Sequence, residues 1–114
     1  MKASEFKLSI VQGVNNLIDD YFGSGSIGDN MLNATLKLLV RQNEHKMDGI
    51  LNMFADENGE IDGNVVVEEY SKVFGNEGII IDIKDFVKSN TVRSFLPNKS
   101  LKVTQDDLRK MILT

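Results

Sequence analysis

The sequence predicts an α+β domain, with four helices followed by a small, mostly antiparallel sheet and a short C-terminal helix. Apolar residues recur at intervals of three and four through the first two thirds of the chain, which is the period of amphipathic helices. A two-residue alternation then begins near residue 78, which favours a strand. Because the chain has only 114 residues, we expect one domain over residues 1–114.

The first helix is predicted over residues 4–22. Its apolar stripe consists of Phe6, Ile10, Val14, Leu17 and Tyr21. Ser4 is the expected N-cap, because its hydroxyl can accept a hydrogen bond from a free backbone N–H. Gly23 should end the helix, and the glycine-serine segment 23–28 should form a loop.

A second apolar stripe runs through residues 29–54 but is interrupted by the polar segment 41–45. We therefore expect two helices, near 29–42 and 44–54, although a single long bent helix is the alternative. Asp29 is the cap candidate for the first helix, and Asn43 should end that helix or cap the next.

A fourth helix is predicted near residues 63–74, from the stripe formed by Val66, Val67, Tyr70, Val73 and Phe74. Asp62 is its expected N-cap, and Gly75 should end it with a positive φ. Three consecutive valines cannot all face one side of a helix. We therefore expect one of them, Val65, to be exposed or to lie at an interface.

About three strands are predicted in the last third of the chain. Alternating isoleucines favour a strand over 78–84, and residues 85–90 should form a turn or a single helical turn. Segments 92–96 and 100–103 flank Pro97-Asn98-Lys99, which is typical of a hairpin. Thr104 should then cap the last helix, whose buried face consists of Leu108, Met111 and Ile112.

Composition limits the possible environment of the chain. It contains no cysteine, so disulfides and thiolate metal sites are excluded. No apolar run approaches the roughly 18 residues of a membrane helix, and no signal-peptide pattern opens the sequence. We therefore expect a cytoplasmic protein without membrane association.

The segment Ala55–Asp62 resembles the centre of a calcium-binding loop of the EF-hand or dockerin type. With Gly59 at the sixth loop position, the resemblance implies metal ligands at Asp56, Asn58, Glu60 and Asp62. Phe54 and Val65 then occupy the first and last ligand positions, and neither can coordinate a hard cation. The alternative interpretation is a turn at Asn58-Gly59 that buries Ile61 and caps the next helix with Asp62.

The charge is unevenly distributed. Residues 1–83 carry six basic and fourteen acidic side chains, whereas residues 84–114 carry seven basic and three acidic ones, so their balances are −8 and +4. The basic part includes Lys84, Lys88, Arg93, Lys99 and Lys102, which are candidate partner-binding residues. Phe86 and Phe95 lie among them, so stacking on single-stranded nucleic acid is an alternative. The net charge of −4 makes a nucleic-acid partner the less favoured one.

No catalytic constellation is evident in the sequence. His45 is the only histidine, and its sequence neighbours are those of a solvated helix start, with no nucleophile nearby. We expect no enzyme activity and no cofactor. The favoured hypothesis is a small non-enzymatic protein-binding or regulatory module of bacterial or phage type, whose partner is another protein or a second copy of the chain. A calcium-binding module using residues 56–62 and a nucleic-acid accessory protein are the two alternatives.

Overall fold

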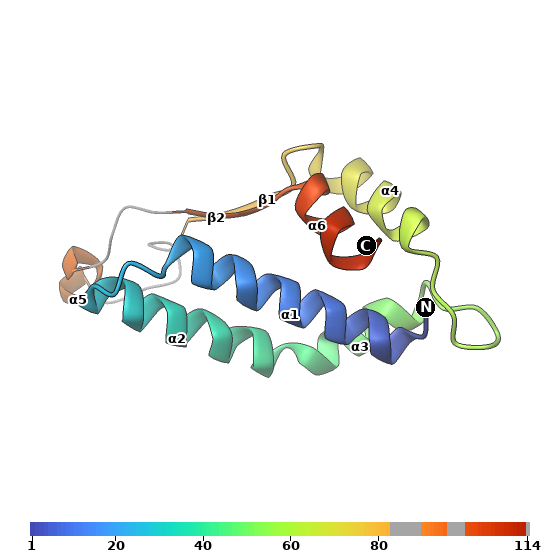
Figure 1. The fold of residues 1–114 in the computed structure, drawn as a ribbon, viewed down its shortest axis with the longest axis horizontal. Coiled ribbons are helices and arrows are strands. Elements are labelled where there is room, and N and C mark those ends of the chain that lie inside the picture. Colours follow the sequence, from blue (N-terminus) through green and yellow to red (C-terminus); the bar gives the residue numbers. More distant parts are fainter. Residues whose placement is uncertain (83–89, 96–99, 114) are drawn as a thin grey trace.

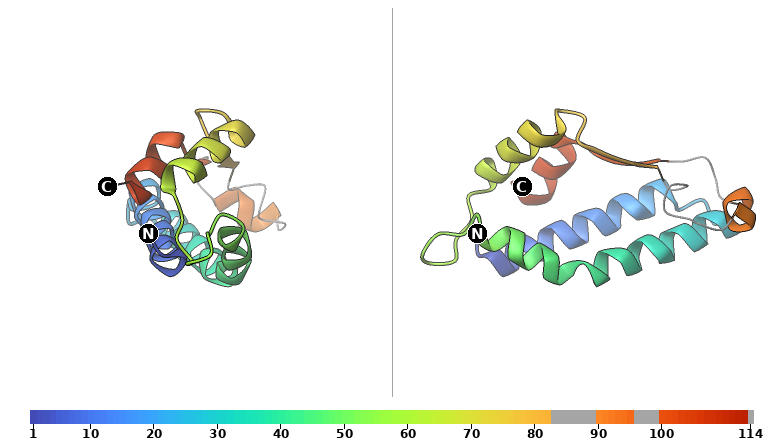
Figure 2. Two further views of the ribbon diagram at one scale, coloured as in Figure 1. Left: turned by 90° about the vertical axis from the view of Figure 1, so that its right-hand side faces the viewer. Right: turned by 180° about the vertical axis from the view of Figure 1, so that it is seen from behind.

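The computed structural model describes residues 1–82, 90–95 and 100–113, and its helices and strands form two layers (Figures 1 and 2). In chain order, the elements are α1 (Ala3–Tyr21), α2 (Ile27–Gln42), α3 (Glu44–Asn52), α4 (Gly63–Phe74), β1 (Ile79–Asp82), α5 (Asn90–Phe95), β2 (Ser100–Val103) and α6 (Gln105–Ile112). Helices α1, α2 and α3 form one layer, and α4, α6 and the two strands lie over it. The α+β class is therefore confirmed. Within the described ranges, no helix is both long and apolar enough to cross a membrane.

The molecule is elongated, and its apolar core is divided between two places along the long axis. Its extents are 50 × 26 × 24 Å, and its radius of gyration is 15.3 Å, against roughly 13 Å for a compact domain of this length. One cluster of buried side chains contains Ile18, Phe22, Leu32, Leu36 and Leu101. The other contains Phe6, Leu51, Ile61, Val67, Leu108 and Ile112. Helix α1 contributes a fully buried residue to each cluster, so it joins the two halves of the core.

The predicted N-caps of the first two helices are wrong by a few residues. Helix α1 begins earlier because Lys2, not Ser4, is its N-cap, and the backbone N–H of Lys2 donates to Glu5 Oε2 (3.4 Å). Ser26 caps α2 by accepting a hydrogen bond from the backbone N–H of Asp29 (3.1 Å). Asp29 is instead buried, and its carboxylate accepts a hydrogen bond from the backbone N–H of Ser24 (3.2 Å).

The break between α2 and α3 lies at Asn43, as expected from the sequence. Its φ of −99° and ψ of 6° leave the helical region, and its side-chain amide donates to the carbonyl of Leu39 (2.7 Å). Asn43 therefore ends α2, and both its backbone N–H (3.1 Å) and its side-chain amide donate to the carbonyl of Leu39. The alternative of one continuous helix is wrong.

The sheet in the described residues has two antiparallel strands rather than about three. Ile79 pairs with Val103 and Ile81 with Leu101, so these four side chains share one face of the sheet. The strand predicted at 92–96 is wrong, because residues 90–95 form α5. Val92 and Phe95 have the three-residue spacing of a helix, and two-residue alternation alone could not distinguish a helix from a strand there. The predicted turn at 97–99 lies outside the described residues.

Tyr70 and Gly78 together join α4 to the sheet. The Tyr70 hydroxyl donates to the carbonyl of Val103 and accepts a hydrogen bond from the backbone N–H of Ile79 (3.0 Å). Burial raises the pKa of Tyr70, so the hydroxyl remains a donor at neutral pH. Gly78 has a φ of +72°, and a Cβ there would lie 1.8 Å from the Val103 carbonyl oxygen. The close approach of α4, β1 and β2 thus requires glycine at this position.

We predict that Gly78→Ala lowers the free energy of unfolding by more than about 2 kcal/mol, because it adds both a clash and a disfavoured φ. Gly49→Ala is the matched control, since a Cβ at this position in α3 meets no atom within 4 Å. It should raise the stability by up to about 1 kcal/mol through helix propensity. Urea unfolding followed by circular dichroism measures both changes. Equal effects of the two substitutions would contradict the proposed role of Gly78.

Candidate functional site

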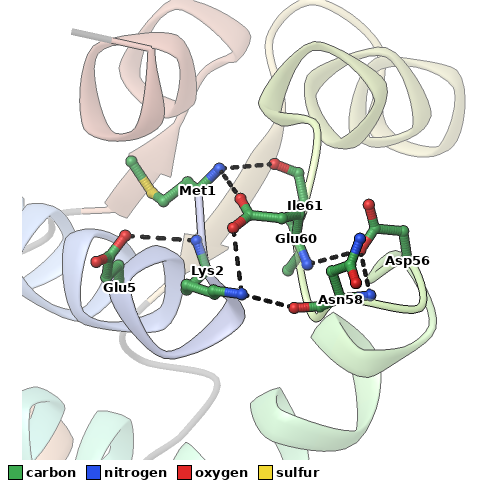
Figure 3. Close-up of polar contacts among 7 residues, drawn as sticks. All are labelled: Met1, Lys2, Glu5, Asp56, Asn58, Glu60 and Ile61. Carbon is green, nitrogen blue, oxygen red and sulfur yellow. Dashed lines mark hydrogen bonds and ion pairs between the residues drawn. The ribbon is translucent and has the colours of Figure 1, made fainter.

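The loop between α3 and α4 is a tight turn organised by Asp56 (Figure 3). Its Oδ1 accepts hydrogen bonds from the backbone N–H groups of Asn58 (2.8 Å) and Glu60 (2.9 Å). Gly59 has a φ of +75°, which places the turn at Asn58-Gly59 as the sequence predicts. Ile61 is 4% exposed and belongs to the second core cluster, so the loop is anchored by a buried side chain.

The N-terminal segment binds this loop from one side (Figure 3). Lys2 and Glu60 form an isolated antiparallel bridge, and the N–H of Ile61 donates to the carbonyl of Met1 (2.8 Å). The Met1 amine lies 2.8 Å from Glu60 Oε2. Lys2 Nζ lies 3.4 Å from Glu60 Oε1 and donates to the carbonyl of Asn58 (2.7 Å). We name Met1, Lys2, Asn58 and Glu60 the N-terminal clasp.

The clasp changes the titration of its charged groups. The hydrogen bond from the Met1 amine, with a smaller contribution from Lys2, lowers the pKa of Glu60. Glu60 in turn raises the pKa of that amine. Asp56 also has a lowered pKa, because the backbone N–H groups of Glu60 and Asn58 stabilise its carboxylate.

The four predicted calcium ligands lie on one loop, and the side chains of three of them, Asp56, Glu60 and Asp62, are engaged elsewhere. Asp56 accepts backbone hydrogen bonds, and Glu60 pairs with the N-terminal segment. Asp62 caps α4 by accepting a hydrogen bond from the N–H of Asn64 (2.9 Å). In the part of the chain that the structure describes, no three acidic, histidine or cysteine residues are grouped to hold a metal. The calcium site stays a prediction.

An apolar groove of about 580 Å³ lies between the two layers. Its floor includes Ile10, Val14 and Ile18 of α1, and its walls come from α2 and α3 on one side and from α4, β1, β2 and α6 on the other. Asn43 and Tyr70 are the only described lining residues with polar side chains. The amide of Asn43 donates to Leu39, and the hydroxyl of Tyr70 bonds to Val103 and Ile79. This size is typical of binding sites, and the lining is almost entirely hydrocarbon.

The edge of the groove on α3 is apolar and exposed. Lys46, Ile50 and Met53 follow one another at helical spacing, and Ile50 itself lines the groove together with Met47. The opposite side of α3 faces α1, where Asp48 pairs with Lys7 (3.0 Å). Ile50 is 57% exposed and Met53 is 83% exposed. We name Lys46, Ile50 and Met53 the α3 lip.

The edge on α4 has the same character. Val65, Glu69 and Val73 recur every four residues and flank the lining residues Val66 and Tyr70. Val65 is 44% exposed and Val73 is 70% exposed. We name Val65, Glu69 and Val73 the α4 lip. Seen along the long axis, α1 and α6 lie on one side of the molecule, and α3 and α4 lie on the other (Figure 2, left).

Sequence reasoning found one residue of this groove's edge and missed the rest. The run of three valines identified Val65 as exposed, and the structure confirms it. The sequence also contained an indication of the α3 lip. Ile50 and Met53 make the apolar stripe of Met47 and Leu51 wider than the face that one helix needs for packing against its neighbours. The groove itself depends on the distance in space between the two layers. The periodicity of apolar residues in the sequence does not give that distance.

The predicted basic partner-binding residues are only partly described. Lys102 lies on the face of β2 opposite Leu101, in register with Ile80, and Arg93 lies in α5. Lys84, Lys88 and Lys99 lie outside the described residues. A basic surface for nucleic acid or an acidic protein therefore stays a prediction. His45 is exposed at the start of α3.

No protein-family model, curated protein or solved structure matches this chain.

We predict that Glu60→Gln lowers the melting temperature at pH 7, because it removes the carboxylate of the clasp. The folded pKa of Glu60 is lowered, so its contribution is present above the ordinary glutamate pKa and is lost as the pH falls through the folded value. The difference between wild type and variant should therefore shrink in acid. Glu57→Gln, in the same loop and exposed, is the control and should leave the melting temperature unchanged. If the difference in melting temperature between wild type and Glu60→Gln did not change with pH, the stabilising role assigned to the ionised Glu60 carboxylate would be wrong.

We also predict that about 10 mM calcium chloride leaves the melting temperature of the protein unchanged. Even the weakest calcium modules, with dissociation constants near 1 mM, would gain about 1.4 kcal/mol at that concentration. Differential scanning calorimetry with magnesium chloride at equal concentration controls for ionic strength. A calcium-specific rise that Asp56→Asn abolishes would establish the predicted metal site instead.

Proposed function

We propose that this chain is a small non-enzymatic protein-binding module, and that its apolar groove takes up an apolar face of a protein partner. The observation that carries this proposal is the continuity between the groove and its lips. The apolar lining continues into exposed apolar residues on both sides, namely the lining residue Ile50 of α3 with Met53 just after that helix, and Val65 and Val73 of α4. Contiguous exposed apolar surface with a few polar residues at its edge is typical of protein interfaces.

The chemistry of the groove also favours binding over catalysis. Its lining offers hydrocarbon, and its two polar side chains already have hydrogen-bond partners. A catalytic site needs a nucleophile, acid, base or metal facing the reacting atoms. The favoured role is thus recognition, in which affinity comes from burying apolar surface.

We predict that Ile50→Glu and Val73→Glu each abolish capture of the cellular partner, because a carboxylate would be buried in an apolar interface. The measurement is in-cell crosslinking followed by affinity purification and quantitative mass spectrometry. Leu8→Glu is the matched control, since Leu8 is 57% exposed, as Ile50 is, but lies on the side of α1 opposite Ile10. Thermal unfolding first establishes that all three variants are folded.

Proteins recovered by wild type and Leu8→Glu, but lost by both lip variants, would support the proposal. Recovery of the same proteins by all four forms would contradict it, because binding would then not use the groove. Loss of the same proteins in Leu8→Glu would also contradict it.

A further inference from the structure

We infer that the groove binds an amphipathic α-helix of a partner protein through apolar side chains at positions i and i+3 or i+4. The inference rests on the proposed function and specifies what kind of partner surface the groove takes. Three features of the groove favour a helix: its almost entirely apolar lining, its length, and the charges on its lips.

Hydrogen bonding favours a helix over an extended peptide in the groove. The Tyr70 hydroxyl is engaged by Ile79 and Val103, and the Asn43 amide by Leu39. The remaining lining side chains are apolar. An extended segment lying on them would have backbone N–H and C=O groups without partners, which is costly in an apolar site. A helix satisfies these groups internally and presents only side chains.

The length of the groove matches the spacing of helical anchors. On α1, the lining residues Ile10 and Val14 are partly exposed and lie about 6 Å apart at 1.5 Å per residue, whereas Ile18 is fully buried. Anchors at i and i+4 of a docked helix are also about 6 Å apart. One turn of a partner helix therefore covers the accessible floor on α1. The lip residues Ile50 and Val73 then face the sides of that helix rather than its anchors.

The lips carry opposite charges, which complement the flanks of an amphipathic helix. The α3 lip contains Lys46, which is exposed. The α4 lip contains Glu69, and with its neighbours Glu68 and Lys72 it has an excess of one negative charge. A helix with acidic residues on one flank of its apolar stripe and basic residues on the other meets both lips favourably. A hydrocarbon chain would fill the floor but leave Met53 and Val73 exposed to water.

The test uses a fluorescent synthetic peptide of about 16 residues. Its leucines follow the i, i+4, i+7 pattern, with glutamates on one flank and lysines on the other. An isomer of the same composition, with its leucines spread around the helix, is the control. We expect saturable binding of the striped peptide by fluorescence anisotropy, with a dissociation constant on the order of 10–100 μM, and no binding of the isomer.

The variants of the full chain locate the peptide. Ile50→Glu and Val73→Glu should weaken its binding by more than about tenfold. Lys46→Glu should weaken it by only about twofold to fivefold, as expected for an exposed charge pair, and added salt should remove that difference. Leu8→Glu should bind as wild type does.

Equal binding of the striped peptide and its isomer, or no saturable binding of the striped peptide at about 1 mM, overturns the inference. Two related results identify another occupant and likewise overturn it. Saturable binding of dodecanoate that Ile50→Glu abolishes, without peptide binding, indicates a hydrocarbon ligand. Dimerisation that Ile50→Glu abolishes, again without peptide binding, indicates a second copy of the chain.

These outcomes also separate the inference from the proposed function. If the cellular partner is lost by the lip variants while the striped peptide does not bind, the groove binds protein but not a helix. If the lip variants lose neither partner nor peptide, both proposals are wrong.

Discussion

The structure depends on the burial of α1 between two separate clusters of apolar side chains. Phe6 near one end of the helix and Ile18 near the other are both fully buried, and each holds a different group of elements against α1. The layer of α2 and α3 and the layer of α4, α6 and the sheet therefore both rest on the same helix. Because the two layers meet mainly through α1, the space between them remains as a groove.

The groove wall formed by α4 and the sheet is held in place by hydrogen bonds and a close backbone contact. Tyr70 binds both strands through one hydroxyl, and Gly78 allows the chain to pass close to the carbonyl of Val103. At the other end of α4, Asp62 caps the helix and the N-terminal clasp holds the preceding loop. The position of α4 is thus fixed at both ends. Its exposed valines, Val65 and Val73, lie along the opening of the groove, and α3 forms the opposite edge of that opening. A binding surface built on such fixed helices loses little conformational entropy when a partner docks.

Local patterns predicted the elements and their caps better than they predicted the arrangement. Helix α4 begins after Asp62 and ends before Gly75 as the sequence indicates, because capping is decided by adjacent residues. Ser4 was a wrong cap because Lys2 is drawn into a bridge with Glu60, a contact between residues far apart in sequence. Asp29 was a wrong cap because α2 begins earlier, where the Ser26 hydroxyl accepts the hydrogen bond from the backbone N–H of Asp29. The helix at residues 90–95 was missed because its apolar spacing fits two periods. The groove was beyond prediction, since periodicity gives the apolar faces but not their separation.

The exposed lip residues are better explained by recognition than by incomplete packing of a small core. A core that packs poorly leaves polar groups without partners as well as apolar gaps. Here the Tyr70 hydroxyl and the Asn43 amide nitrogen in the groove both have hydrogen-bond partners, while Ile50, Met53, Val65 and Val73 leave apolar surface exposed along its edges. Helix α4 is held to the sheet by the bonds of Tyr70, and α3 is held to α1 by the pairing of Asp48 with Lys7. A partner that covers the lips from outside, as we propose, leaves both sets of contacts in place.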